Sequence, residues 1–171
     1  ASNIHRLQQI INSSIKYGRK VAFSGRSMEK ISDVAVKLGY LDMPEGLLVD
    51  LKDLRLYNND QITIVTTGSQ GEPMSALTRI ASSTHKNIQI EKDDMIIISA
   101  SPIPGNEKAV SRVINELTHK GAEVIYDSAE NIHVSGHACQ EELKLMQTLV
   151  KPRHFIPVHG EYRHLKQHGE L

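Results

Sequence analysis

Short apolar segments alternate with amphipathic helices along this chain, and this alternation is the feature that most restricts its fold. Each predicted strand is a short apolar or β-branched run, and Gly- or Ser-containing loops and helices follow the strands. The predicted strands are residues 20–24, 61–67, 95–100, 123–126, 132–134 and 155–158. Such an alternation predicts an α/β fold with a mainly parallel sheet flanked by helices.

Residues that commonly cap helices mark several of the predicted helix ends. Ser2 or Asn3 can accept a hydrogen bond from the first turn of a helix that Gly18 ends. Ser27 is the predicted cap of a second helix, which Gly39 ends. The further predicted helices are residues 73–81, 107–119, 140–150 and 161–167.

The composition excludes several classes of protein. The 171 residues contain 20 Lys and Arg and 20 Asp and Glu, so the formal net charge is zero. A chain without excess positive charge is not expected to bind nucleic acid by bulk charge. Aromatic residues make up only 4 % with no Trp, so a stacking platform for single-stranded bases is not expected. The single cysteine excludes an internal disulfide framework and a zinc site built from cysteines. No apolar run is long enough for a bilayer and no signal-peptide pattern occurs, so we expect a cytoplasmic protein without a membrane partner.

The loops after the predicted strands collect Gly, Ser and His. Because ligands of open α/β sheets bind at the carboxyl ends of the strands, these loops are the candidate site. They are residues 24–27, 67–72, 99–106, 135–137 and 159–161. Gly and Ser also favour ordinary loops and caps, so this coincidence alone does not identify a ligand.

The segment His133-Val134-Ser135-Gly136-His137 is a candidate phosphate site. On a strand, His133 and Ser135 would share one face, and Gly136 permits a sharp turn. His137 then lies near the start of a helix, where backbone N–H groups suit a phosphate. Histidine can donate a hydrogen bond to a phosphoryl oxygen or transfer a proton near pH 7. A plain strand–turn–helix junction explains the same residues equally well.

His159 is a candidate metal ligand, because it ends an apolar strand and Gly160 follows it. From this motif alone, an ordinary loop histidine beside Glu161 is the favoured alternative. The sequence contains nine histidines but no His-x-His-x-Asp-His cluster. A catalytic zinc ion needs about three protein ligands, so this chain cannot supply a complete metal site.

Two further segments could bind anions. Residues 66–73 are similar to a phosphate-binding loop but lack the Gly-Lys-Ser/Thr ending of a Walker A motif, and a simple strand–helix connection is the favoured alternative. At the N-terminus, Ser2 and Asn3 can leave helix-start N–H groups free for an anion, and Arg6 adds positive charge one turn later. A plain helix cap is the favoured alternative there.

Six motifs occur in order along nearly the whole chain. They are residues 1–6 (ASNIHR), 25–28 (GRSM), 67–73 (TGSQGEP), 99–107 (SASPIPGNE), 133–138 (HVSGHA) and 157–162 (PVHGEY). Together these motifs resemble the β-CASP domain of bacterial ribonuclease J. One such motif would be a weak signal, whereas six in register are specific.

The resemblance implies part of a metal-dependent ribonuclease. In that family the β-CASP domain is inserted into a metallo-β-lactamase domain, and two divalent metal ions, usually taken as zinc, activate water for hydrolysis of RNA phosphodiesters. The implied substrate is single-stranded RNA with a 5′-monophosphate, degraded from the 5′ end and also cleaved internally during rRNA processing and mRNA decay. A homo-oligomer of the full-length protein and an RNA-degradation complex are the other implied partners.

The resemblance also implies roles for particular residues. His159 matches the histidine that completes the metal site, and His137 matches the histidine near the scissile phosphate, with His133 beside it as a second catalytic residue. The implied phosphate-binding residues are Ser2, Asn3, Ile4, His133, Val134, Ser135, Gly136 and His137.

The same resemblance predicts the domain organisation. Residues 1–152 would form the β-CASP domain, and residues 153–171 would begin the return segment to a metallo-β-lactamase domain whose metal-binding cluster this sequence lacks. We therefore expect a piece of a larger protein that folds but has little or no nuclease activity alone. A non-catalytic phosphate- or nucleotide-binding α/β module, or an interaction domain, is the alternative.

Overall fold

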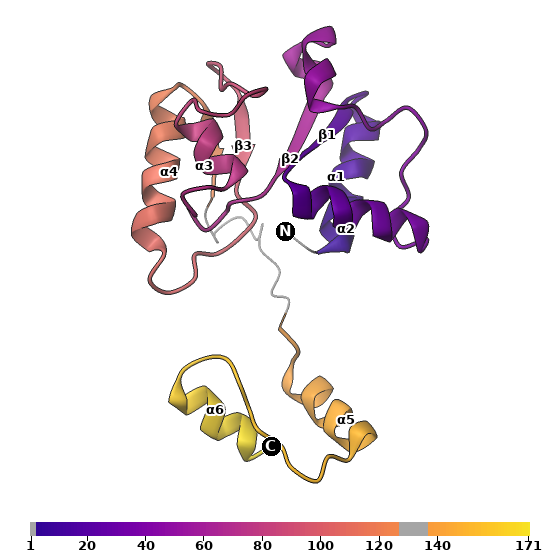
Figure 1. Cartoon of the computed structure of the whole chain (residues 1–171), viewed down its shortest axis with the longest axis vertical. Helices are drawn as coiled ribbons and strands as arrows, with labels where there is room; N and C mark the ends of the chain where they lie inside the picture. Colours follow the sequence, from indigo (N-terminus) through magenta and orange to yellow (C-terminus); the bar gives the residue numbers. More distant parts are fainter. Residues whose placement is uncertain (1–2, 127–136) are drawn as a thin grey trace. The chain divides into compact units, whose positions relative to one another are not determined.

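The computed structural model describes residues 3–126 and 137–171, and the chain divides into two units, residues 1–134 and residues 135–171 (Figure 1). The first unit carries the strands and four of the labelled helices, whereas the second carries two helices. None of the helices in the described ranges is both long and apolar enough to cross a bilayer.

The first half of the larger unit is built on a parallel strand pair. β1 (Lys20–Ser24) pairs with β2 (Ile62–Thr66), from Lys20 opposite Ile62 to Ser24 opposite Thr66. The helices α1 (Ile4–Lys16) and α2 (Arg26–Lys37) contact β1, and two 3-10 turns, η1 (Leu51–Leu56) and η2 (Asn59–Gln61), precede β2. The core of this half comprises Leu7, Ile11, Val21, Phe23, Met28, Ala35, Leu41 and Leu47.

The second half repeats this arrangement on a separate parallel pair. β3 (Met95–Ile97) pairs with β4 (Glu123–Ile125), and α3 (Ala76–Ala81) and α4 (Glu107–His119) lie beside them (Figure 1). Its core comprises Leu77, Ala81, Ile98, Val110, Val113, Ile114 and Leu117. The predicted α/β fold with parallel strands flanked by helices is therefore confirmed, although the described strands form two pairs rather than one continuous sheet.

The helix caps agree with the sequence at one position and differ at two. Asn3 caps α1, because the Arg6 N–H donates to its Oδ1 over 3.0 Å. The prediction that Ser27 caps α2 is wrong: Ser27 lies inside that helix, and its N-cap is Gly25 at φ +131°. The helix predicted from residue 73 begins only at Ala76, after the cap Ser75, because turns occupy the residues before it.

The second unit consists of α5 (Gln140–Val150), α6 (Tyr162–Gly169) and the segment between them. The strand predicted at residues 155–158 is wrong, because this run finds no pairing strand among the described residues and its Ile156 and Val158 side chains are 80 % and 75 % exposed. No described residue of this unit is fully buried. The strand predicted at residues 132–134 lies outside the described residues.

Candidate functional site

The side chains of His137 and His159 lie against each other in the second unit. Their ring centroids are 5.5 Å apart and the ring planes are tilted by 58°. Both residues are exposed, although 22 positions separate them in the sequence. The fold thus brings together the two histidines that the sequence singled out.

His137 is positioned by the start of α5. Two residues later, Cys139 is the N-cap of this helix, and its backbone N–H donates to the Glu142 carboxylate over 2.8 Å. This backbone hydrogen bond, together with the Cys139 side chain, holds the pKa of Glu142 below its usual value. The carboxylate in the first helical turn therefore fixes the turn that carries His137.

His159 occupies a matching position before α6. Its backbone lies in the left-handed region at φ +75°, and Gly160 follows at φ +99°. The N-cap of α6 is Glu161, whose N–H donates to Nδ1 of His164 over 3.1 Å. A non-glycine residue in this conformation costs about 1–3 kcal/mol, and such strain tends to occur at functional sites.

The segment leading to His159 is held on α6 by ring packing rather than by strand pairing. The Phe155 ring meets the His168 ring edge-on, with centroids 4.9 Å apart. Pro157 lies near Gly169 at the end of the same helix, close enough that an added Cβ there would meet its Cγ at 3.9 Å. These contacts give His159 a defined place without the expected strand.

The two imidazoles could bind an anion or contribute to a metal site, but the metal ligands of this chain are incomplete. Within residues 3–126 and 137–171, no group of three or more His, Cys, Asp or Glu side chains could hold a metal ion. Imidazole is a good zinc ligand, so the exposed ring of His159 fits the role of one ligand among several.

The N-terminal candidates lie in the other unit. The Asn3 side chain serves as the α1 cap, and Ile4 begins that helix. Nearby, Nη1 of Arg6 donates to the carbonyl of Ser99, after β3. The remaining predicted site residues lie outside the described residues: Ser2, His133, Val134, Ser135 and Gly136.

The sequence did not single out His85, which lies beside the end of β1. Nε2 of His85 is 3.2 Å from Oγ of the buried Ser24, and its Nδ1 accepts hydrogen bonds from the N–H groups of Asn87 and Ile88. Burial, and then the charge of Arg79, lower the pKa of His85. The ring is therefore neutral near pH 7, with its proton on Nε2.

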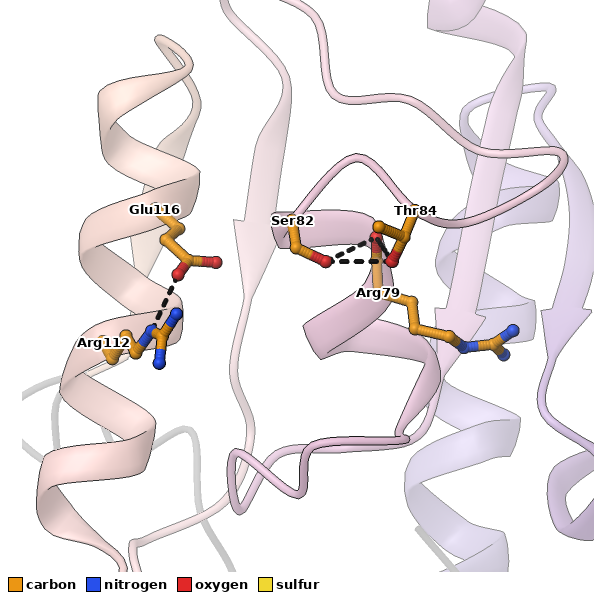
Figure 2. Close-up of polar contacts among 5 residues, drawn as sticks. All are labelled: Arg79, Ser82, Thr84, Arg112 and Glu116. Carbon is orange, nitrogen blue, oxygen red and sulfur yellow. Dashed lines mark hydrogen bonds and ion pairs between the residues drawn. The ribbon is translucent and has the colours of Figure 1, made fainter.

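The turn that precedes His85 is held by hydrogen bonds to the backbone carbonyl of Arg79. The Arg79 carbonyl accepts hydrogen bonds from the hydroxyls of Ser82 and Thr84, and these hydroxyls also bond to each other (Figure 2). Figure 2 also shows the ion pair of Arg112 and Glu116 on α4, which lies on the helix surface. No sequence motif indicates the contact of His85 with Ser24, because the two residues are 61 positions apart along the chain.

Comparisons with known proteins agree with this α/β architecture. The model of the family described as "Ribonuclease J, beta-CASP domain" matches residues 1–117. A second model, described as "Zn-dependent metallo-hydrolase RNA specificity domain", matches residues 121–171. Residues 1–117, about two thirds of the chain, are thus an α/β domain of the β-CASP class. The chain as a whole belongs to the ribonuclease J family, so the resemblance seen in the sequence is confirmed.

Several curated relatives cover nearly the whole chain. Ribonuclease J of Helicobacter pylori strain 26695 is 54 % identical over 99 % of this chain and 25 % of its own length. Ribonuclease J of Thermus thermophilus is 52 % identical over 96 % of this chain and 28 % of its own length. Ribonuclease J2 of Bacillus subtilis is 44 % identical over 100 % of this chain and 31 % of its own length. The chain therefore spans about a quarter to a third of the relatives it matches.

Proposed function

We propose that this chain is the substrate-positioning part of a metal-dependent ribonuclease that hydrolyses RNA phosphodiesters. One observation carries the proposal: the rings of His137 and His159 lie 5.5 Å apart, each just before a helix, in a chain of the ribonuclease J family. Two imidazoles at this separation can act on neighbouring atoms of one substrate group.

The two histidines have different roles in this proposal. His159 is a ligand of a divalent metal centre, with two zinc ions in the complete enzyme. When bound, such ions neutralise phosphate charge and supply an activated water. His137 donates a hydrogen bond to the scissile phosphate, and His133 assists it as a second catalytic residue. The structure supports these roles through the fixed helix starts behind both rings.

Substrate phosphates are bound by two further segments in this proposal. Val134, Ser135 and Gly136 offer backbone N–H groups next to His137, and Ser2, Asn3 and Ile4 form a second phosphate site at the start of α1. Phosphate contacts carry no base information, so the enzyme accepts many sequences. The net charge of zero supports binding of a few nucleotides rather than of a long duplex.

The names of the relatives indicate RNA as the substrate, and the resemblance of the six sequence motifs supports the finer proposal. We propose single-stranded RNA with a 5′-monophosphate as the substrate, with 5′-to-3′ exonuclease and endonuclease action in rRNA processing and mRNA decay. The proposed setting is a homo-oligomer in the cytoplasm, in contact with other RNA-degrading proteins.

The domain organisation is part of the proposal. Although the two family models match residues 1–117 and 121–171, we propose that the β-CASP domain extends over residues 1–152 and that residues 153–171 belong structurally with a metallo-β-lactamase domain. The exposed Ile156 and Val158 side chains support this, because apolar side chains of this size favour burial against a further surface. The isolated chain would then be inactive, because its metal ligands are incomplete.

RNA hydrolysis by single-site variants of the full-length enzyme tests the two histidines. We expect His137→Ala and His159→Ala each to reduce kcat/KM by at least about 100-fold, the range for loss of a group that acts in the transition state. The matched control is His154→Ala, an exposed histidine in the same unit, which should leave hydrolysis within about twofold. Full activity of His159→Ala would instead favour a phosphate-binding module without catalysis.

A further inference from the structure

The side chain of Gln70 joins the loop after β2 to the loop after β3. The amide of Gln70 donates through Nε2 to the carbonyl of Ser101 over 3.1 Å and accepts through Oε1 from the N–H of Ile103 over 2.8 Å. Glutamine satisfies a backbone acceptor and a backbone donor at once, which a carboxylate cannot do. Gln70 therefore clamps residues 101–103 by their backbone.

The loop that carries Gln70 is itself fixed. Gly71 packs against α4 so closely that an added Cβ would lie 2.6 Å from the Ala109 carbonyl carbon. The N–H of Gly71 also donates to the carbonyl of Gly68 over 3.1 Å, which closes a turn. The backbone of the loop that carries Gln70 is thus held in place beside α4.

In the described part of the chain, the side chains of residues 101–105 do not anchor the middle of the clamped loop to a core. Residues 101–105 are all exposed, including Ile103, so their side chains do not tie the loop to a core. Arg6 holds the loop at its beginning, through the Ser99 carbonyl. Near its end, the N–H of Asn106 donates to the Ile103 carbonyl over 2.9 Å. Between these points, Gln70 sets the position of the loop.

The position of this loop makes it a candidate contact for substrate. It follows β3 at the carboxyl end of a parallel pair, which is the edge where α/β sheets bind ligands. Its small residues let a sugar–phosphate backbone approach closely, and Pro102 and Pro104 reduce the freedom that binding would have to remove.

We propose that Gln70 is a positioning residue for RNA, which holds residues 99–106 in the conformation that contacts the sugar–phosphate backbone. This inference rests on the proposed function. Because Gln70 would touch no reacting atom, its loss should raise KM for RNA and leave kcat nearly unchanged.

The test uses the full-length enzyme with Gln70→Ala, Gln70→Glu and the control Gln89→Ala, an exposed glutamine whose side chain forms no hydrogen bond within the described part of the chain. Hydrogen exchange at the Ile103 amide and steady-state kinetics on a 5′-monophosphorylated single-stranded RNA are measured. We expect Gln70→Ala to speed exchange at Ile103 and to raise KM at least severalfold, because it removes two hydrogen bonds that are each worth about 2–10-fold. Gln89→Ala should change neither.

Gln70→Glu separates the two bonds of the clamp. It keeps an acceptor for the Ile103 N–H but places a carboxylate oxygen against the Ser101 carbonyl, so KM should rise while Ile103 stays more protected than in Gln70→Ala. It also provides the test if Gln70→Ala does not fold. Faster exchange at Ile103 with unchanged KM would overturn the inference alone. An unmodified enzyme that does not hydrolyse the RNA would overturn the proposed function as well.

Discussion

His137 and His159 each lie two residues before the N-cap of a helix, and their ring centroids are 5.5 Å apart. In both cases the backbone N–H of the cap is held by the side chain three residues later, Glu142 for α5 and His164 for α6. The second unit therefore presents one imidazole from each of two similarly built helix starts.

Gly160 should be intolerant of a side chain. It lies at φ +99°, and an added Cβ would meet Nδ1 of His164 at 3.1 Å, so Gly160→Ala should destabilise the α6 start by about 1–3 kcal/mol and displace His159. Hydrogen exchange at the Glu161 amide in the full-length enzyme measures this loss.

Gly169→Ala is the matched control for that glycine. Gly169 ends α6 without a positive φ, and an added Cβ there would make an ordinary 3.9 Å contact. This variant should be neutral or slightly stabilising, because alanine favours helices over glycine. Equal exchange at Glu161 in both variants would contradict the role given to Gly160.

The stability of the larger unit should depend on the core of its second half. Leu117 is fully buried in α4, so Leu117→Ala should cost about 2–5 kcal/mol of unfolding free energy. Leu149→Ala, at a 70 % exposed position of α5, should cost far less. Urea unfolding followed at residues of β3 and β4 measures the difference, and equal losses would argue against this core.

His85 should make its turn sensitive to acid. Its pKa is lowered in the folded protein, so the unfolded chain binds the proton more readily. The stability that the neutral ring contributes is complete above about pH 6.5, the ordinary histidine value, and is lost as the pH falls below it. Protonation of Nδ1 would also remove the acceptor for the Asn87 and Ile88 N–H groups.

An NMR titration of the histidine rings measures this directly. We expect a midpoint for His85 below the ordinary histidine value of about 6.5, and faster exchange at the Ile88 amide, corrected for its intrinsic rate, as the pH falls from 6.5. His85→Ala should abolish this pH dependence. A His85 midpoint at or above about 6.5, the ordinary histidine value, would refute the assignment.

Local patterns predicted the elements whose sequence signal lies within the segment itself. The strand at residues 20–24 and the helix at residues 107–119 match β1 and α4, because buried apolar runs and helical spacing are visible in the sequence itself. Residues 155–158 are an apolar run typical of a strand. A strand also needs a partner strand, however, and no local sequence pattern predicts one.

Contacts between distant residues explain what the sequence did not predict. Gln70 reaches residues 31 and 33 positions away, and His85 reaches Ser24 across 61 positions. The two histidines of the site were predicted because glycine and helix starts adjoin them, whereas their proximity depends on the path of the chain between the starts of α5 and α6.

The metal content of purified full-length variants tests the central proposal most directly. If His159 is a metal ligand and His137 acts on the phosphate, His159→Ala should lose bound metal after dialysis, whereas His137→Ala and His154→Ala should keep as much as the unmodified enzyme. Full metal content in His159→Ala, or equal loss in His137→Ala, would contradict these roles.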